Sequence, residues 1–196
     1  VVVWIQPPSG SFFKVDPAQN GKWWPDKVEL NQPHCAFVPH VMWAVPNVAN
    51  NPDDPKKLVP SGQKFFVSNT AAVSHNTKWS TFIPSGGPDA GSLPPLAPGT
   101  KGRELNPPLK GNNLLVLFEC DIHKWMNAYL WVFDHPYADV TKPDGSFEIK
   151  NVPAGSKVRL TAWHEVGGFL TKNQSKGEDL QLEADKTEHN LELEVK

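Results

Sequence analysis

Proline is the feature that most limits what this chain can fold into. The 196 residues include 20 prolines and 14 glycines. Because proline lacks a backbone N–H and fixes one backbone dihedral, it interrupts helices and the inner ladders of sheets. No stretch has the apolar spacing of a convincing amphipathic helix. The sequence therefore predicts an all-β protein, built from short strands and long ordered loops.

The overall composition excludes several classes of protein. With 39% apolar and 20% charged residues, the chain is globular and can bury a core. Its net charge of −2 and the lack of a basic stripe argue against nucleic acid as a partner. Val1–Ile5 is apolar but too short for a signal peptide or a membrane span, so we expect a mature or truncated chain without one.

Short apolar or alternating runs between turn residues predict the strands. These runs are residues 1–5, 33–45, 64–69, 113–120, 129–133, 147–149, 157–163, 180–182 and 191–195. Residues 83–110 are dominated by Pro, Gly and Ser, and we expect an ordered irregular loop there.

The chemically richest stretch joins two of these runs. Cys120, His123 and Met126 follow the spacing C-x2-H-x2-M. A strand that ends at a thiolate, turns past His and Met, and leaves as a second strand can direct all three at one point. A thiolate, imidazole and a weak thioether are ligands of a blue-copper electron-transfer site, which also needs a second histidine.

His75 is the candidate for that second histidine, because it follows the strand predicted at residues 64–69. The order of a His-Asn pair before C-x2-H-x2-M resembles the cupredoxin family, and its amicyanin–plastocyanin branch most closely. The resemblance covers roughly residues 33–133 and includes Phe37-Val-Pro39, Gly62-Gln-Lys-Phe65, Ser68-Asn69 and His75-Asn76.

The resemblance implies a Greek-key cupredoxin sandwich over residues 28–134 that binds copper. Cys120 would be the thiolate ligand, His75 and His123 the in-plane imidazoles, and Met126 the weak axial ligand that tunes the potential. The alternative is a cupredoxin-like sandwich that no longer binds metal, in which these four residues are not ligands.

Two further residues receive roles from the resemblance. Asn76 would tie the two ligand loops together. His123, beside Trp125, would be the ligand nearest to solvent, so that both residues form the electron port.

Cys35 departs from the family pattern and leaves three alternatives open. Cys35 and Cys120 form a disulfide that abolishes the blue site, or both bind copper, or Cys35 is a buried bystander. The other histidines, His34, His40, His135 and His164, are expected to be hydrogen-bonded structural residues. The first three of them are also candidates for an additional ligand, whereas His189 is expected at the surface.

The last third of the chain has a different sequence pattern. Asp144-Gly145-Ser-Phe147 and Val152-Pro-Ala-Gly155 resemble the pattern of carboxypeptidase-regulatory-like, transthyretin-type β sandwiches. This resemblance implies a second small β sandwich over residues 135–196, completed by the N-terminal strand within residues 1–27. Together with Trp163-His164-Glu165, the set resembles bacterial extracytoplasmic cupredoxin-like proteins, some labelled as methylamine-utilisation proteins.

These observations favour a copper-binding electron-transfer protein in the bacterial periplasm or outside the cell, with a redox protein or a larger complex as partner. A metal-free structural subunit with a Cys35–Cys120 disulfide is the alternative, and copper storage or delivery is a third. An enzyme is not expected, because the chain has no nucleophile elbow, phosphate loop or zinc-protease motif.

Overall fold

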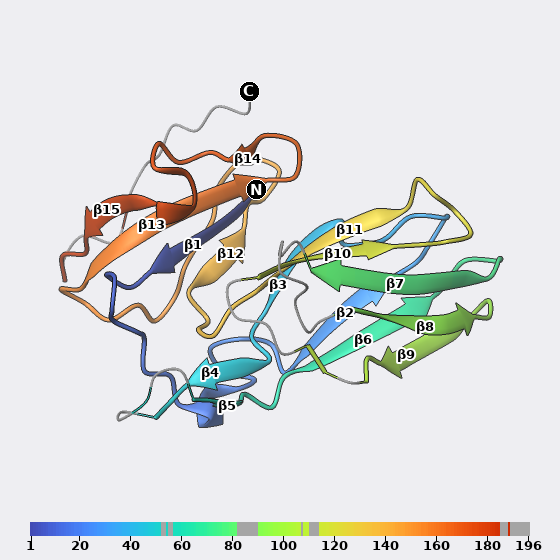
Figure 1. Cartoon of the computed structure of the whole chain (residues 1–196), viewed down its shortest axis with the longest axis horizontal. Helices are drawn as coiled ribbons and strands as arrows, with labels where there is room; N and C mark the ends of the chain where they lie inside the picture. Colours follow the sequence, from blue (N-terminus) through green and yellow to red (C-terminus); the bar gives the residue numbers. More distant parts are fainter. Residues whose placement is uncertain are drawn as a thin grey trace. The chain divides into compact units, whose positions relative to one another are not determined.

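The computed structural model describes residues 1–51, 54, 57–81, 90–106, 108–109, 114–184 and 188. Strands are the main regular structure of these residues, which confirms the all-β prediction (Figure 1). The helical elements in the described ranges are two short 3₁₀ turns, Pro17–Gln19 and Gln174–Lys176. No helix in this part of the chain is long and apolar enough to cross a membrane.

The chain divides into two compact units, one formed by Val15–Pro136 and the other by Val1–Lys14 with Tyr137–Lys196. The first unit, hereafter the central unit, contains the strands β2 (Lys27–Asn31), β3 (Val41–Ala44), β4 (Asn47–Ala49), β5 (Leu58–Pro60), β6 (Lys64–Asn69), β7 (His75–Thr81), β8 (Gly91–Leu96), β9 (Thr100–Glu104), β10 (Leu114–Glu119) and β11 (Asn127–Val132). The second, hereafter the terminal unit, contains β1 (Val2–Gln6), β12 (Ala138–Val140), β13 (Lys157–His164), β14 (Gly168–Phe169) and β15 (Glu178–Gln181).

The central unit is built from two main sheets. One has the strand order β3-β11-β10-β7-β8, and the other has the order β2-β6-β9 (Figure 1). The pairs β3–β11 and β2–β6 are parallel, whereas the remaining neighbours in both sheets are antiparallel. A separate pair, β4 with β5, completes the strands of this unit.

The core of the central unit lies between its two sheets, because side chains on a strand alternate between opposite faces. Val116 and Phe118 of β10 are buried, as are Leu130 and Val132 of β11. The ring of Phe118 stacks on that of Phe65 from β6, with centroids 5.4 Å apart. The two inner faces therefore pack directly on each other.

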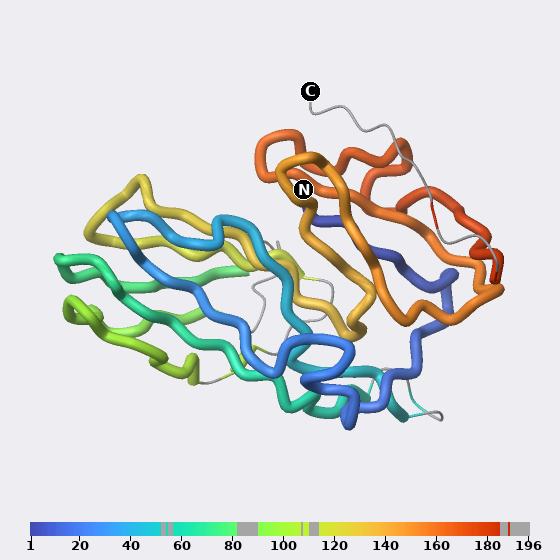
Figure 2. The backbone as a smooth tube through the Cα atoms, turned by 180° about the vertical axis from the view of Figure 1, so that it is seen from behind, coloured from blue at the N-terminus to red at the C-terminus, as the bar shows by residue number. Residues whose placement is uncertain are grey.

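The terminal unit joins the two ends of the chain in one sheet. Its order is β12-β1-β13-β14, with β15 also paired to β13. Figure 2 shows the blue N-terminal strand running beside the orange strands of this unit. A core of Val3, Ile5, Tyr137, Val158, Leu160 and Ala162 covers one face. Within its described residues this unit has one sheet, and residues 147–149, predicted as a strand, are not one.

Two sequence predictions for the central unit are wrong. In residues 33–45 only Val41–Ala44 is a strand, because the chain turns sharply at Pro33–Ala36. In residues 83–110 the chain forms β8 and β9 instead of an irregular loop. Both are edge strands of their sheets, where proline is tolerated because one side of the backbone needs no partner. The strand predicted at residues 191–195, like His189, lies outside the described residues.

Candidate metal centre

The proposed ligands gather where β7, β10 and β11 meet. Strand β10 runs antiparallel to both neighbours, so its end lies beside the beginnings of β7 and β11. Cys120 follows β10 in the alternation that buries Val116 and Phe118, and Met126 precedes β11 in the alternation that buries Ala128. His75, the first residue of β7, is fully buried. The two-residue period therefore points all three side chains into the same end of the core.

Cys120 has both imidazoles within reach. Its Sγ lies 4.0 Å from Nδ1 of His75 and 3.9 Å from Nδ1 of His123. The two rings are 4.6 Å apart between centroids. Two more polar groups contact the sulfur: the backbone N–H of His123 donates to it at 3.4 Å, and the thiol lies 3.4 Å from Oδ1 of Asn76. The N–H donor stabilises a thiolate, whereas Oδ1 of Asn76 accepts from the protonated thiol.

His75 is held in the form that binds metals. Burial, with a smaller contribution from nearby His123, lowers the pKa of His75 below its ordinary value. The ring is therefore neutral at neutral pH, as a metal ligand must be. Its Nε2 is buried and has no hydrogen-bond partner among the described residues. A buried polar atom of this kind is costly, so the histidine is placed here at the expense of stability.

The loop between β10 and β11 holds the remaining ligands in place. Met126 is buried in the core cluster that also contains Cys120. Its backbone N–H donates to the carbonyl of His123 at 2.9 Å, and its carbonyl accepts from the N–H of Cys120 at 3.3 Å. His123 is partly exposed, and Trp125 beside it is 69% exposed. The rings of these two residues contact each other edge-on at 5.2 Å.

Asn76 connects the two ligand-bearing segments. Its Oδ1 accepts a hydrogen bond from the backbone N–H of Asp121 at 2.8 Å, and its Nδ2 donates to Oδ2 of Asp121 at 2.9 Å. The bond from Nδ2 of Asn76, with a second one from Lys78, holds the pKa of Asp121 below its usual value. The sequence singled out Asn76 for this role but not Asp121. A carboxylate directly after the thiolate ligand was the signal available for it.

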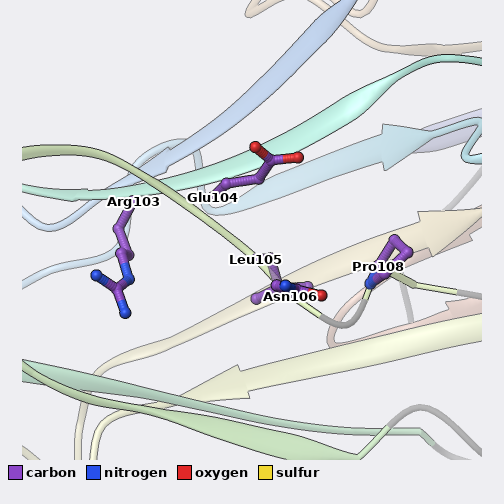
Figure 3. A pocket seen from close by; sticks show the side chains of 5 residues that line it. All are labelled: Arg103, Glu104, Leu105, Asn106 and Pro108. Atoms are coloured by element: carbon purple, nitrogen blue, oxygen red, sulfur yellow. The ribbon is translucent and has the colours of Figure 1, made fainter.

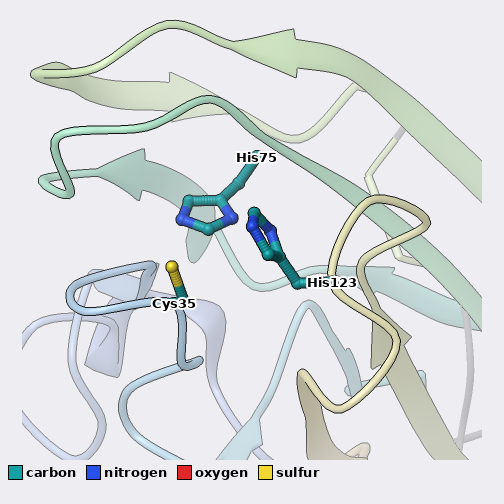
Figure 4. A group of neighbouring side chains, drawn as sticks. All are labelled: Cys35, His75 and His123. Atoms are coloured by element: carbon teal, nitrogen blue, oxygen red, sulfur yellow. The ribbon is translucent and has the colours of Figure 1, made fainter.

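Cys35, in the segment between β2 and β3, also lies beside the two imidazoles. One ligand atom each of Cys35, His75 and His123 all lie within 4.8 Å of one another, and Figure 4 shows the Cys35 sulfur directed toward the two rings. Both Cys35 and Cys120 are free thiols in the structure. The Cys35–Cys120 disulfide considered from the sequence is therefore not formed.

The other described histidines lie outside the cluster of Cys35, His75 and His123. His40 is exposed and places Nδ1 3.0 Å from the carbonyl oxygen of Asn127. His164 accepts from the N–H of Val166 at 3.1 Å in a turn of the terminal unit. Full burial lowers the pKa of His135 to about 3, so this ring is neutral. His34 is exposed, and neither it nor His40 nor His135 belongs to the cluster around Cys35 in the described ranges.

A surface hollow at the end of β9 has a different character. It has a volume of about 460 Å³ and is lined by Arg103, Glu104, Leu105, Asn106 and Pro108 (Figure 3). None of these residues carries a thiol or an imidazole. The hollow therefore offers no soft metal ligand.

The donor set fits copper. A sulfur bound at about 2.3 Å and a nitrogen at about 2.1 Å, separated by about 110–130°, lie roughly 3.6–4.0 Å apart across one metal ion. The two Sγ–Nδ1 distances of Cys120 are 4.0 and 3.9 Å. One thiolate with two imidazoles and a buried thioether nearby is the combination found in blue-copper sites.

Comparisons with known proteins found similarity in solved structures alone. No family model matches the chain, and no curated protein matches it either. A copper-containing nitrite reductase from Thermus scotoductus SA-01 is 16% identical over 56% of this chain and 23% of its own, with a TM-score of 0.38. The chain thus spans less than a quarter of that protein's length.

Two smaller proteins are similar over nearly their whole length. A purple cupredoxin from Nitrosopumilus maritimus is 16% identical over 54% of this chain and 98% of its own, with a TM-score of 0.34. An amicyanin variant in its reduced state is 15% identical over 66% of this chain and 98% of its own, with a TM-score of 0.36. Because these scores are low, the function proposed below rests on the residues of this chain.

Proposed function

We propose that the central unit is a cupredoxin-like copper domain that transfers electrons. The observation that carries this proposal is the position of the Cys120 sulfur, 4.0 and 3.9 Å from Nδ1 of two imidazoles. His75, Cys120 and His123 would hold the ion, and Met126 would be the weak axial ligand. Copper bound there supplies a one-electron couple.

The protein contributes a rigid and partly dry site. His75, Cys120 and Met126 are buried at the end of a packed core, which limits movement of the ligands when the charge at the site changes. Asn76 fixes the segment that follows Cys120 through its two bonds to Asp121. His123 is partly exposed and would be the point where an electron enters or leaves.

The surface around His123 is suited to contact with another protein. Ile122 and Trp125, in the same loop, are large exposed apolar side chains, and Val73 just before β7 is another. Exposed apolar groups gathered beside a site favour docking by a partner. We propose a redox protein or a larger complex as that partner. We place both in the bacterial periplasm or outside the cell, because the sequence resembles families of extracytoplasmic proteins.

Copper loading of the purified protein tests the proposal. We expect one copper per chain by elemental analysis and an intense visible band from thiolate-to-copper charge transfer in the oxidised protein. Substitution Cys120→Ser is expected to weaken and shift the band strongly, because serine provides no thiolate in place of Cys120. His164→Gln is the matched control, since this imidazole lies in the terminal unit and should leave the band unchanged.

The same experiment can also contradict the proposed function. A wild-type protein that takes up no copper, or takes it up without a visible band, contradicts electron transfer at Cys120. Copper that binds with the expected band but exchanges rapidly with a chelator would instead favour storage or delivery, which needs the same soft ligands with easier release.

A further inference from the structure

Cys35 is placed beside two of the proposed copper ligands. Its Sγ and one nitrogen of each of His75 and His123 lie within 4.8 Å of one another (Figure 4). A sulfur and a nitrogen on opposite sides of one metal ion are about 4.4 Å apart. The same pair of imidazoles therefore has a thiol from Cys35 as well as one from Cys120.

The backbone that carries Cys35 adopts an unusual conformation. His34 and Cys35 have φ values of 50° and 53°, and the N–H of Ala36 closes the turn on the carbonyl of Pro33 at 3.0 Å. Two successive residues with side chains in the left-handed region are disfavoured. Conformations of this kind concentrate where function requires them. Here the turn directs the thiol toward the imidazoles.

Trp125 fixes this turn to the ligand loop. Its indole Nε1–H donates to the carbonyl oxygen of Cys35 at 3.1 Å, and its ring contacts His123 edge-on at 5.2 Å. The indole is otherwise 69% exposed, so burial alone does not explain its position. One side chain of the loop between β10 and β11 thus links Cys35 to the proposed ligand His123.

We propose that Cys35 provides a second thiolate ligand to the copper ion held by His75, Cys120 and His123, with Trp125 as a positioning residue. This inference rests on the proposed function. When the bond forms, the thiol of Cys35 releases its proton to solvent and its sulfur donates an electron pair to the ion, so no oxidant is consumed. Two thiolates then balance the charge of Cu(II), and the site differs from a blue site with one thiolate.

X-ray absorption at the copper edge tests the proposal by counting short copper–sulfur bonds. We expect two such bonds in the wild type and one in Cys35→Ser, together with a different visible spectrum for the variant. One bond in both proteins, with identical spectra, would overturn the role of Cys35. A wild type without any short copper–sulfur bond would instead contradict the proposed function itself.

Alkylation of the wild type provides a readout that needs no cysteine variant to fold. Cys35 is partly exposed, so iodoacetamide should label it in the metal-free protein. Anaerobic loading with Cu(I) should slow this labelling about tenfold or more, because a metal-bound thiolate is not free to react. Equal rates with and without copper would overturn the proposal.

The role of Trp125 is tested by the same labelling assay. Trp125→Phe keeps an aromatic ring beside His123 but removes the N–H that binds the Cys35 carbonyl. We expect copper to protect Cys35 less well in this variant, while Trp23→Phe, at another exposed tryptophan of the central unit, should behave as the wild type. Unchanged protection in Trp125→Phe would remove Trp125 from the proposal.

Discussion

Asn76 is the residue on which the relative position of the two ligand-bearing segments depends. It is buried, and both atoms of its amide bond to Asp121, one through the backbone and one through the carboxylate. The same oxygen lies 3.4 Å from the sulfur of Cys120. A single amide therefore holds the start of β7 against the residue that follows the proposed thiolate ligand.

Replacing Asn76 by alanine should weaken both metal binding and folding. Residues that orient metal ligands typically contribute about 10–100-fold to affinity. The lost bonds should lower the free energy of unfolding of the metal-free protein by about 1–3 kcal/mol. Chelator competition measures the first effect and thermal unfolding the second. Asn173→Ala, at an exposed site of the terminal unit, is the control, and an Asn76 variant with wild-type affinity would contradict the assigned role.

At the scale of single residues, the sequence indicated which residues form the candidate site better than it indicated what surrounds them. Spacing alone indicated Cys120, His123 and Met126 as a group, because a short loop between two strands brings such residues together. Cys35 was placed on a strand, whereas it lies in a turn with a positive φ. Its hydrogen bond to Trp125 joins residues far apart in the chain, and spacing carries no information about such a bond.

Strands were predictable wherever the alternation of apolar residues was strong. Strands β6, β10, β11 and β13 lie within two residues of the predicted ranges, because burial of one face requires that alternation. Strand β8 was missed, since Gly91, Pro94 and Pro95 give it the composition of a loop. Its position at the edge of the sheet, next to β7, permits these residues and cannot be read from local sequence.

Strand β8 makes a testable contribution through Gly91. This residue pairs with Trp79 of β7, and a Cβ added there would lie closer to the buried indole ring than van der Waals contact allows. Gly91→Ala should therefore lower the free energy of unfolding by about 1–3 kcal/mol. Urea unfolding measures this loss. The exposed neighbour Ser92→Ala should change stability little, and equal stabilities for both variants would show that Gly91 does not pack on Trp79.

At the scale of the whole molecule, the chain forms two units with separate cores. The core around Phe118 and Cys120 and the core around Val3 and Leu160 have no residue in common. Strand β1 lies between β12 and β13, so the sheet of the terminal unit combines residues from both ends of the chain. The chain in between forms the central unit with the proposed copper ligands.

A charge in the middle of β1 should disrupt the terminal unit selectively. Val3 is buried and pairs with Asp139 on one side and Ala162 on the other. Val3→Asp places a carboxylate in this apolar core, and an uncompensated buried charge costs about 3–5 kcal/mol. We expect faster hydrogen exchange in β13, with protection in β10 and the copper-dependent band retained, because the cores are separate.

Hydrogen exchange followed by mass spectrometry reports on β13 and β10 in the same sample. Ser9→Asp adds the same charge at an exposed position and should leave exchange in both strands unchanged. Full protection of β13 in Val3→Asp would show that β1 does not support this sheet. Equal loss of protection in β13 and β10 would show that the central unit depends on the N-terminal strand for its folding, because a substitution in the core of the terminal unit would then unfold both units.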